Sequence, residues 1–157
     1  MTTWRYDRGD KRAVAGAAEM IVIGRVLAQI DALPQQLGRR SIPRTQFSVE
    51  VIRCLKGDRT GRMVVSQMGG RSPDGSLHVF DKDRLLRVGH VHLLAGRYSE
   101  PDGWYALIAR AGTRYLGGDP DSAALDSVTA EWREPIANPT PLRRRTKGPD
   151  APKESPE

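Results

Sequence analysis

Two histidines, at positions 90 and 92, are the first residues whose type and spacing suggest chemistry. Side chains two apart on a strand point to the same face, so His90 and His92 together offer two nitrogen ligands to a metal ion. No third or fourth ligand is evident beside them in the sequence. Cys54 and His78 would contribute only if the fold brought them close. We therefore expect neither a metal nor a cofactor.

The acidic residues form two further groups with a chemical interpretation. Asp119, Asp121 and Asp126 lack the glycine and the terminal glutamate of a calcium-binding loop, so helix capping is the favoured role. Asp81 and Asp83 stand two apart in a polar stretch. Two carboxylates perform acid and base catalysis only when a pocket separates their pKa values, and nothing in the sequence argues for such a pocket.

The single cysteine, Cys54, has the basic residues Arg53 and Lys56 nearby, and positive charge can lower the pKa of a thiol. No motif places a catalytic histidine beside it, so we interpret Cys54 as a structural thiol and expect no enzymatic activity. One cysteine forms no internal disulfide, which suits a reducing compartment. The charged N-terminus is a poor secretory signal and no apolar run is long enough to span a membrane. We expect a cytoplasmic protein.

Charge is unevenly distributed along the 157 residues, whose net value is +6. Residues 36–62 are mainly basic and residues 100–135 are mainly acidic, which predicts a two-sided molecule with one face drawn to phosphate or to acidic protein surfaces. An Arg-rich, Lys-poor composition is also what a GC-rich genome encodes without any selected partner. The expected anion or nucleic-acid contacts are Arg39, Arg40, Arg44, Arg53, Lys56, Arg59, Arg62, Arg143, Arg144 and Arg145.

A β-hairpin between Arg44 and Gln67 is the clearest structural element. Thr45, Phe47, Val49 and Val51 alternate with Gln46, Ser48 and Glu50, which predicts an apolar inward row and a polar outward row. The stretch from Lys56 to Gly61 supplies the turn, and Met63, Val64 and Val65 begin the returning strand. All seven side chains of the first strand are assigned to a face by this alternation.

Shorter signals surround this hairpin. Residues 12–18 predict one or two helical turns. Residues 20–23 predict a strand that is buried on both faces, bulged or bent at Gly24 and continued to residue 30. Residues 31–43 and 68–75 carry the prolines and glycines of exposed loops. A short apolar piece covers residues 77–80. A second hairpin pairs residues 90–95 with 104–108 across a turn at 99–103.

The C-terminal part of the chain begins at Gly117-Gly118. Asp119 before Pro120 predicts an N-cap, and residues 123–132 continue as a short amphipathic helix. From Pro135 the chain is rich in proline and arginine and almost lacks apolar residues, which predicts a disordered tail. We expect one β-barrel domain over residues 1–134, with its core at about 15–116, followed by the tail at 135–157.

Several of these segments carry a family resemblance. They are the run from Ala18 to Val26 (AEMIVIGRV), then FSVEV from Phe47 with Leu55-Lys56-Gly57, VVSQ from Val64 with Gly69-Gly70, and Val88-Gly89 before HLL at His92. Over roughly residues 15–116 the chain resembles small bacterial β-barrel domains that share the topology of OB-folds and of the inhibitory domain of tissue metalloproteinase inhibitors.

The resemblance implies a mainly β fold, a small OB-like barrel of roughly five to six strands flanked by a short helical turn and a short C-terminal helix. It implies no defined chemistry, because every matched segment is a strand or a turn. The N-terminal cysteine and disulfides of the metalloproteinase inhibitors have no counterpart, so their activity is not implied here. His92 stands where similar domains usually carry a tyrosine, which indicates a packing role.

These observations favour a non-catalytic binding or accessory module with a protein partner. The alternative is a nucleic-acid-associated accessory protein, for DNA maintenance or transfer, that binds phosphates through basic loops and the tail. Base stacking fits less well, because Phe47 is predicted to point inward and the turn that precedes Trp104 and Tyr105 is acidic.

Overall fold

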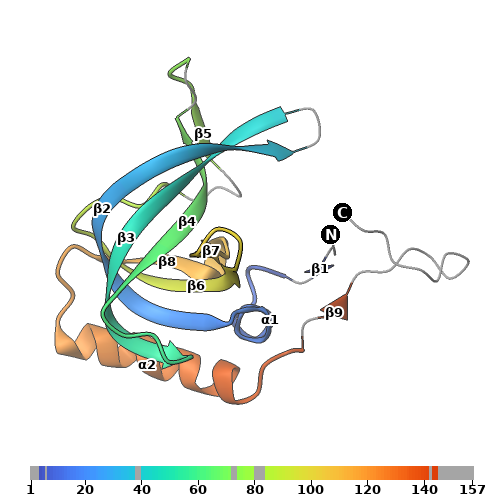
Figure 1. Cartoon of the computed structure of the whole chain (residues 1–157). Coiled ribbons are helices and arrows are strands. Elements are labelled where there is room, and N and C mark those ends of the chain that lie inside the picture. The colour runs from blue at the N-terminus through green and yellow to red at the C-terminus, as the bar shows by residue number, and fades with distance from the viewer. Residues whose placement is uncertain are drawn as a thin grey trace, which may run out of the picture.

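Apolar alternation in the first half of the chain builds long, curved strands (Figure 1). The computed structural model describes residues 4–5, 7–37, 40–71, 74–79, 84–141 and 143–144. Within these residues no helix is both long enough and apolar enough to cross a membrane. The helices are α1 (Lys11–Ala17), the 3-10 turn η1 (Arg110–Gly112) and α2 (Ser122–Ala137). The strands are β1 (Trp4–Arg5), β2 (Met20–Leu37), β3 (Arg40–Lys56), β4 (Arg62–Arg71), β5 (Leu77–Val79), β6 (Val91–Ser99), β7 (Trp104–Leu107), β8 (Thr113–Gly117) and β9 (Arg143–Arg144).

Five strands close into a barrel in the order β2-β3-β4-β7-β6, because β6 pairs back onto β2. All these pairings are antiparallel except that of β4 with β7, which is parallel. β8 extends the sheet beyond β6, and β5 pairs with the end of β4. The small OB-like barrel and the mainly β class predicted from the sequence are confirmed.

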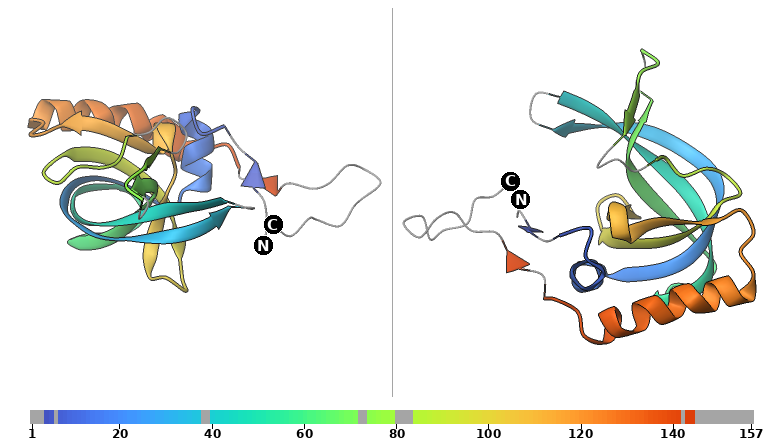
Figure 2. Two further views of the ribbon diagram at one scale, coloured as in Figure 1. Left: turned by 90° about the horizontal axis from the view of Figure 1, so that it is seen from above. Right: turned by 180° about the vertical axis from the view of Figure 1, so that it is seen from behind.

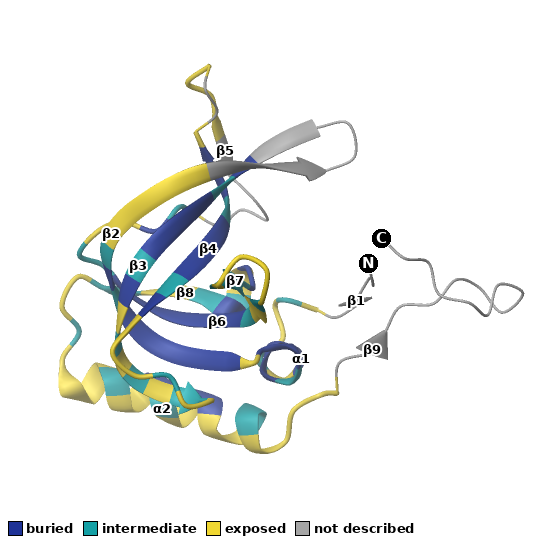
Figure 3. Cartoon of the chain, viewed as in Figure 1, coloured by how far each residue is buried: buried dark blue, intermediate teal, exposed yellow. Residues whose placement is uncertain are grey.

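Two apolar layers hold the barrel and its helices together, and Figure 3 colours the buried residues of the strands and helices dark blue. Alternate residues of β2 point to opposite sides, so Val22 and Val26 face the barrel interior while Ile21 and Ile23 face the helices. The interior layer contains Met20, Val22, Val26, Phe47, Val49, Met63, Val65, Leu86 and Leu94. The helix-covered layer joins α1, α2, β2 and β6 through Val14, Ala15, Ala17, Ala18, Ile21, Ile23, Val91, Leu93, Ala95, Ile108, Val128 and Trp132.

Residues 20–23 of β2 are therefore buried on both faces, as the sequence predicts, whereas residues 28–30 are exposed. The bend of β2 falls at Gly24, where the pairing with β3 shifts register. A Cβ atom at this position would lie 2.4 Å from Val49 Cγ1, so only glycine lets the two strands approach this closely. The tight interior thus explains the glycine.

The central hairpin folds as expected, with one exception on its outer face. Phe47 and Val49 are fully buried in the barrel interior, and Glu50 is exposed. Gln46, predicted to face solvent, is only 2% exposed because its side chain lies along β4 and bonds to Ser66. The outer face of β3 is thus covered near this residue.

Two predicted loops are strands instead. Residues 31–37 and 40–43 extend β2 and β3 as a two-stranded arm beyond the barrel, in which Pro34 and Pro43 stand opposite each other. A ribbon of two strands leaves one edge of each strand without a neighbour, so a residue that lacks an N–H is tolerated there. Residues 68–71 continue β4, where Gly70 at φ +132 leaves room for Thr45 Oγ1. At both sites the prolines and glycines predicted a loop, although the residues form strands.

The C-terminal segment also departs from the prediction. Asp121, and not Asp119, caps α2, since its carboxylate accepts the Ala124 N–H at 2.8 Å. The helix ends at Ala137, so residues 135–137, which were assigned to the tail, belong to α2, and residues 143–144 form β9. β8 was not predicted at all. Residues 145–157, most of the predicted tail, lie outside the described residues.

Candidate binding surfaces

The structure describes the side chains of five of the ten basic residues proposed as anion contacts. Arg39 and Arg145 lie outside the described residues. For Arg40, Arg143 and Arg144 the structure gives the backbone alone, in the arm and in the β1–β9 pair. The side chains of Arg44, Arg53, Lys56, Arg59 and Arg62 are described, and they are distributed along β3, the β3–β4 turn and the start of β4.

Arg53 and Lys56 attach the two helices to the barrel. Arg53 donates to Asp126 Oδ1 at 2.7 Å and to Thr129 Oγ1 at 3.3 Å on α2. Lys56 Nζ donates to the Ala15 and Ala18 carbonyls at the C-terminal end of α1, each at 2.7 Å. Burial, and then repulsion from Arg97, lowers the pKa of Lys56 below its ordinary value. Both cations are therefore used inside the molecule.

Arg44 is largely enclosed on the outer face of β3. Its Nη1 donates to the carbonyl and the hydroxyl of Ser66 at 3.3 Å. Burial lowers the pKa of its guanidinium, and Asp102 in the β6–β7 turn partly opposes that shift. Gln46 beside it donates to the Arg44 carbonyl at 2.9 Å, while Gln46 Oε1 is buried and has no hydrogen-bond partner among the described residues.

Arg59 lies in the β3–β4 turn and Arg62 begins β4. The Arg59 guanidinium stands 5.6 Å from the ring centroid of Tyr105, a cation–π contact. Tyr98 lies beside Tyr105 at 5.1 Å between ring centroids and is partly exposed. Arg62 is exposed. This part of the surface combines two aromatic rings with two arginines.

The basic and the acidic stretch, predicted to form two sides of the molecule, contact each other at two places. The acidic stretch folds against the basic one through the Arg53–Asp126 pair and through the approach of Asp102 to Arg44. Two other arginines, Arg114 and Arg12, pair with Glu131 and Glu134 of α2. Opposite charges that are distant in sequence therefore neutralise one another across the surface.

The carboxylates considered as ligands have structural roles where they are described. Asp119 pairs with Arg25 at 3.4 Å, Asp121 caps α2, and Asp126 holds Arg53. The capping role predicted for this group is correct for Asp121. Asp81 and Asp83 lie outside the described residues.

His90 and His92 form an aromatic cluster with Tyr115 of β8. Their ring centroids lie 4.8 Å and 5.4 Å from that of Tyr115, and 6.4 Å from each other. Burial, and secondarily the neighbouring His90, lowers the pKa of His92 to about 4. Its Nδ1 is buried without a partner among the described residues. The cluster is a packed group whose inner imidazole is neutral at physiological pH.

Cys54 and His78, named as conditional further ligands, are not described as part of this cluster. Cys54 is exposed near the end of β3, where its Sγ lies 3.3 Å from the Lys56 carbonyl. The side chain of His78 is outside the described part of the structure. Among the described residues, no three His, Cys, Asp or Glu side chains come together in a way that could hold a metal ion.

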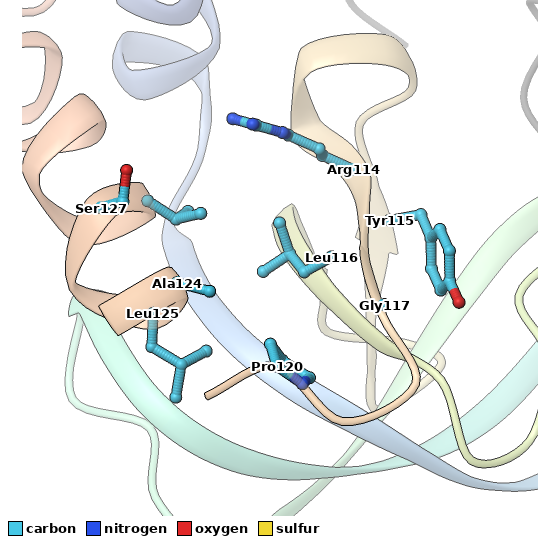
Figure 4. Close-up of a pocket in the computed structure, with 9 residues that line it drawn as sticks. Arg114, Tyr115, Leu116, Gly117, Pro120, Ala124, Leu125 and Ser127 are labelled. Carbon is cyan, nitrogen blue, oxygen red and sulfur yellow. The ribbon is translucent and has the colours of Figure 1, made fainter. Parts of the chain in front are cut away.

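A cleft of about 470 Å³ lies between β8 and α2, and the sequence analysis did not predict it (Figure 4). Arg114 and Leu116 point from β8 towards α2, and Tyr115 points to the other side of the strand. The cleft is lined by Arg114, Tyr115, Leu116, Gly117, Pro120, Ala124, Leu125, Ser127 and Val128. Leu125 and Val128, three apart on a helix, are the one local signal of an apolar face here. Their partner strand, β8, lacked a signal because it is only five residues long and does not alternate polar and apolar residues.

Comparison with known proteins adds no relative to this picture. No family model matches the chain, and no curated protein matches it.

Proposed function

We propose that this chain is a non-catalytic binding or accessory module whose partner is a protein. The observation that supports a protein partner most directly is that most basic side chains of the β3–β4 hairpin already have partners within the chain. Of its five described cations, Arg44, Arg53 and Lys56 bond to other parts of the same chain and Arg59 covers Tyr105. A side chain engaged in this way has less to offer to phosphate.

Exposed apolar side chains support the same proposal. Ile30, Leu77, Val88 and Tyr115 are each more than half exposed and belong to different parts of the barrel surface. Single exposed apolar residues are ordinary, but Tyr115 lies next to a concave, partly apolar cleft. Such a combination suits contact with another polypeptide better than contact with a phosphate backbone. A cytoplasmic location is part of this proposal and agrees with one exposed cysteine.

The test is capture of partners from native cytosol with the immobilised full chain, with and without nuclease, followed by chemical crosslinking. We expect partners that survive nuclease and crosslink directly to this chain. Loss of every partner after nuclease treatment would contradict a protein-binding role and would favour the second candidate.

That second candidate is a nucleic-acid-associated accessory protein. It is favoured by the surface at which Arg59 stands over Tyr105, Tyr98 is 48% exposed and Arg62 faces solvent. Aromatic rings with adjacent arginines are the usual surface for single strands. The arginine-rich sequence after residue 142 adds charge to this candidate.

A titration of labelled single- and double-stranded oligonucleotides at two salt concentrations tests it. We expect any binding to be weak, to show little sequence preference and to fall steeply with salt. Deletion of residues 143–157 leaves α2 intact, removes the run of three arginines and should weaken such binding without unfolding the barrel. Absence of binding at low salt would remove this candidate. Tight, salt-insensitive binding of one sequence would instead show a base-reading surface.

A further inference from the structure

β8 is the last strand of its sheet. It pairs with β6 through Thr113, Arg114, Tyr115 and Gly117, and no strand in the described part of the chain pairs with its other edge. Alternate backbone N–H and C=O groups of a terminal strand point away from the sheet, so this edge presents donors and acceptors in the spacing of another extended chain. α2 lies beside it in both views of Figure 2.

The cleft between β8 and α2 adds side-chain recognition to this edge. Leu116, Leu125 and Val128 give it apolar walls, and Tyr115 projects on the opposite side of β8 (Figure 4). A strand added to β8 would place alternate side chains on these two sides. An aliphatic side chain would enter the cleft, and its neighbours in the sequence would lie over Tyr115. A ligand without an extended backbone would leave the strand edge unused.

The charge at the rim of the cleft selects among extended peptides. Residues 113–131 contain four acidic residues and one arginine. The acidic partners of the two ion pairs formed with the barrel are the more exposed ones: Asp119 is 96% exposed against 32% for Arg25, and Asp126 is 67% exposed against 31% for Arg53. In the third pair, at the cleft itself, Arg114 and Glu131 are similarly exposed, at 43% and 39%. With Asp121 in addition, the four carboxylates outnumber the three guanidinium groups paired with them, which favours a cationic partner.

We propose that the β8 edge and the β8–α2 cleft bind an extended, basic peptide segment of a partner protein, with an aliphatic side chain in the cleft. This mode of binding joins main-chain hydrogen bonds to a sheet edge with pockets for alternate side chains. The inference rests on the proposed function and adds to it the place and the chemistry of the partner.

The test uses a library of random linear peptides displayed on phage and selected on the immobilised full chain. We expect enriched sequences with apolar residues at alternate positions next to Lys or Arg. On titration of a selected peptide, the backbone amide resonances of Thr113–Gly117 and of residues 124–128 should shift. Failure to enrich any sequence, or shifts centred on residues 44–48 and 64–68, would overturn the proposal.

Two exposed alanines of α2 supply matched variants. Ala124 lines the cleft and Ala130 does not, so Ala124→Trp should fill the site while Ala130→Trp leaves it open. We expect Ala124→Trp to weaken peptide binding by about tenfold or more and Ala130→Trp to change it by less than about twofold. Ser127→Lys, compared with Ala130→Lys, should weaken binding through repulsion of the basic peptide. Equal binding by the two tryptophan variants would contradict the site.

The same variants separate this inference from the proposed function. Nuclease-resistant partners captured equally by Ala124→Trp and Ala130→Trp would leave the protein-binding role standing and would overturn the cleft as its site. Capture of no protein and enrichment of no peptide would overturn both. If the chain self-associates and Ala124→Trp abolishes this self-association, the β8 edge binds a second copy of the chain. That result would overturn the proposal of a partner peptide.

Discussion

His92 is a single residue whose burial makes a prediction about pH. It is 7% exposed, and its folded-state pKa of about 4 lies below the ordinary value of 6.5. The unfolded chain therefore binds a proton between these values that the folded chain excludes, so folding stability is fully present above about pH 6.5 and is lost as pH falls towards 4. We expect a loss on the order of 2 kcal/mol, measured by urea denaturation across this range.

Two variants isolate that contribution from the carboxylates that titrate nearby. His92→Phe should show a smaller loss of unfolding free energy below pH 6.5 than the wild type. Other titrating groups contribute equally to both proteins, so the difference between the two curves reports His92. His90→Gln should retain most of the wild-type loss, since burial is the larger cause of the shift and His90 the smaller. Parallel curves for wild type and His92→Phe would contradict the assignment.

The α2 helix is held by two kinds of contact of unequal strength. Trp132 is fully buried in the helix-covered layer, whereas the ion pairs of α2 lie at the surface. We expect Trp132→Ala to lower the free energy of unfolding by about 3–5 kcal/mol through the cavity it creates. Asp126→Asn, which breaks the pair with Arg53, should cost about 1 kcal/mol or less. Urea denaturation measures both decreases in unfolding free energy. Equal decreases would contradict the conclusion that packing of Trp132 holds α2 more strongly than its ion pairs do.

The barrel as a whole depends on its interior, because five strands close around one apolar layer. Val49 is fully buried there, and a carboxylate in its place would have no counter-charge among the interior residues. We expect Val49→Asp to unfold the domain. Ser48→Asp, one residue away on the outer face, should keep a cooperative thermal transition close to the wild type. An unchanged melting temperature of Val49→Asp would show that the strand register is wrong.

Local sequence determined which segments pair and which faces they bury. The alternation from Thr45 to Val49 set the inward row of β3, and the doubly apolar run at Met20 set a strand covered on both sides. These features follow from a period of two residues, which a short stretch of sequence contains in full. The two hairpins were predictable for the same reason. The helices followed from other local signals, a helical composition for α1 and an N-cap with an amphipathic pattern for α2, although Pro135 concealed the last turn of α2.

Tertiary structure decided the rest, because those features depend on residues distant in sequence. Residues 31–37 and 40–43 form an arm because they pair with each other and place Pro34 opposite Pro43, a fact that neither proline carries alone. The roles of Arg53 and Lys56 were set by α2 and α1, which supply their hydrogen-bond partners. The β8–α2 cleft likewise exists only after β8 pairs with β6 and Trp132 docks the helix. Composition records charges and apolar residues, but long-range pairing decides which of them neutralise each other and which face solvent.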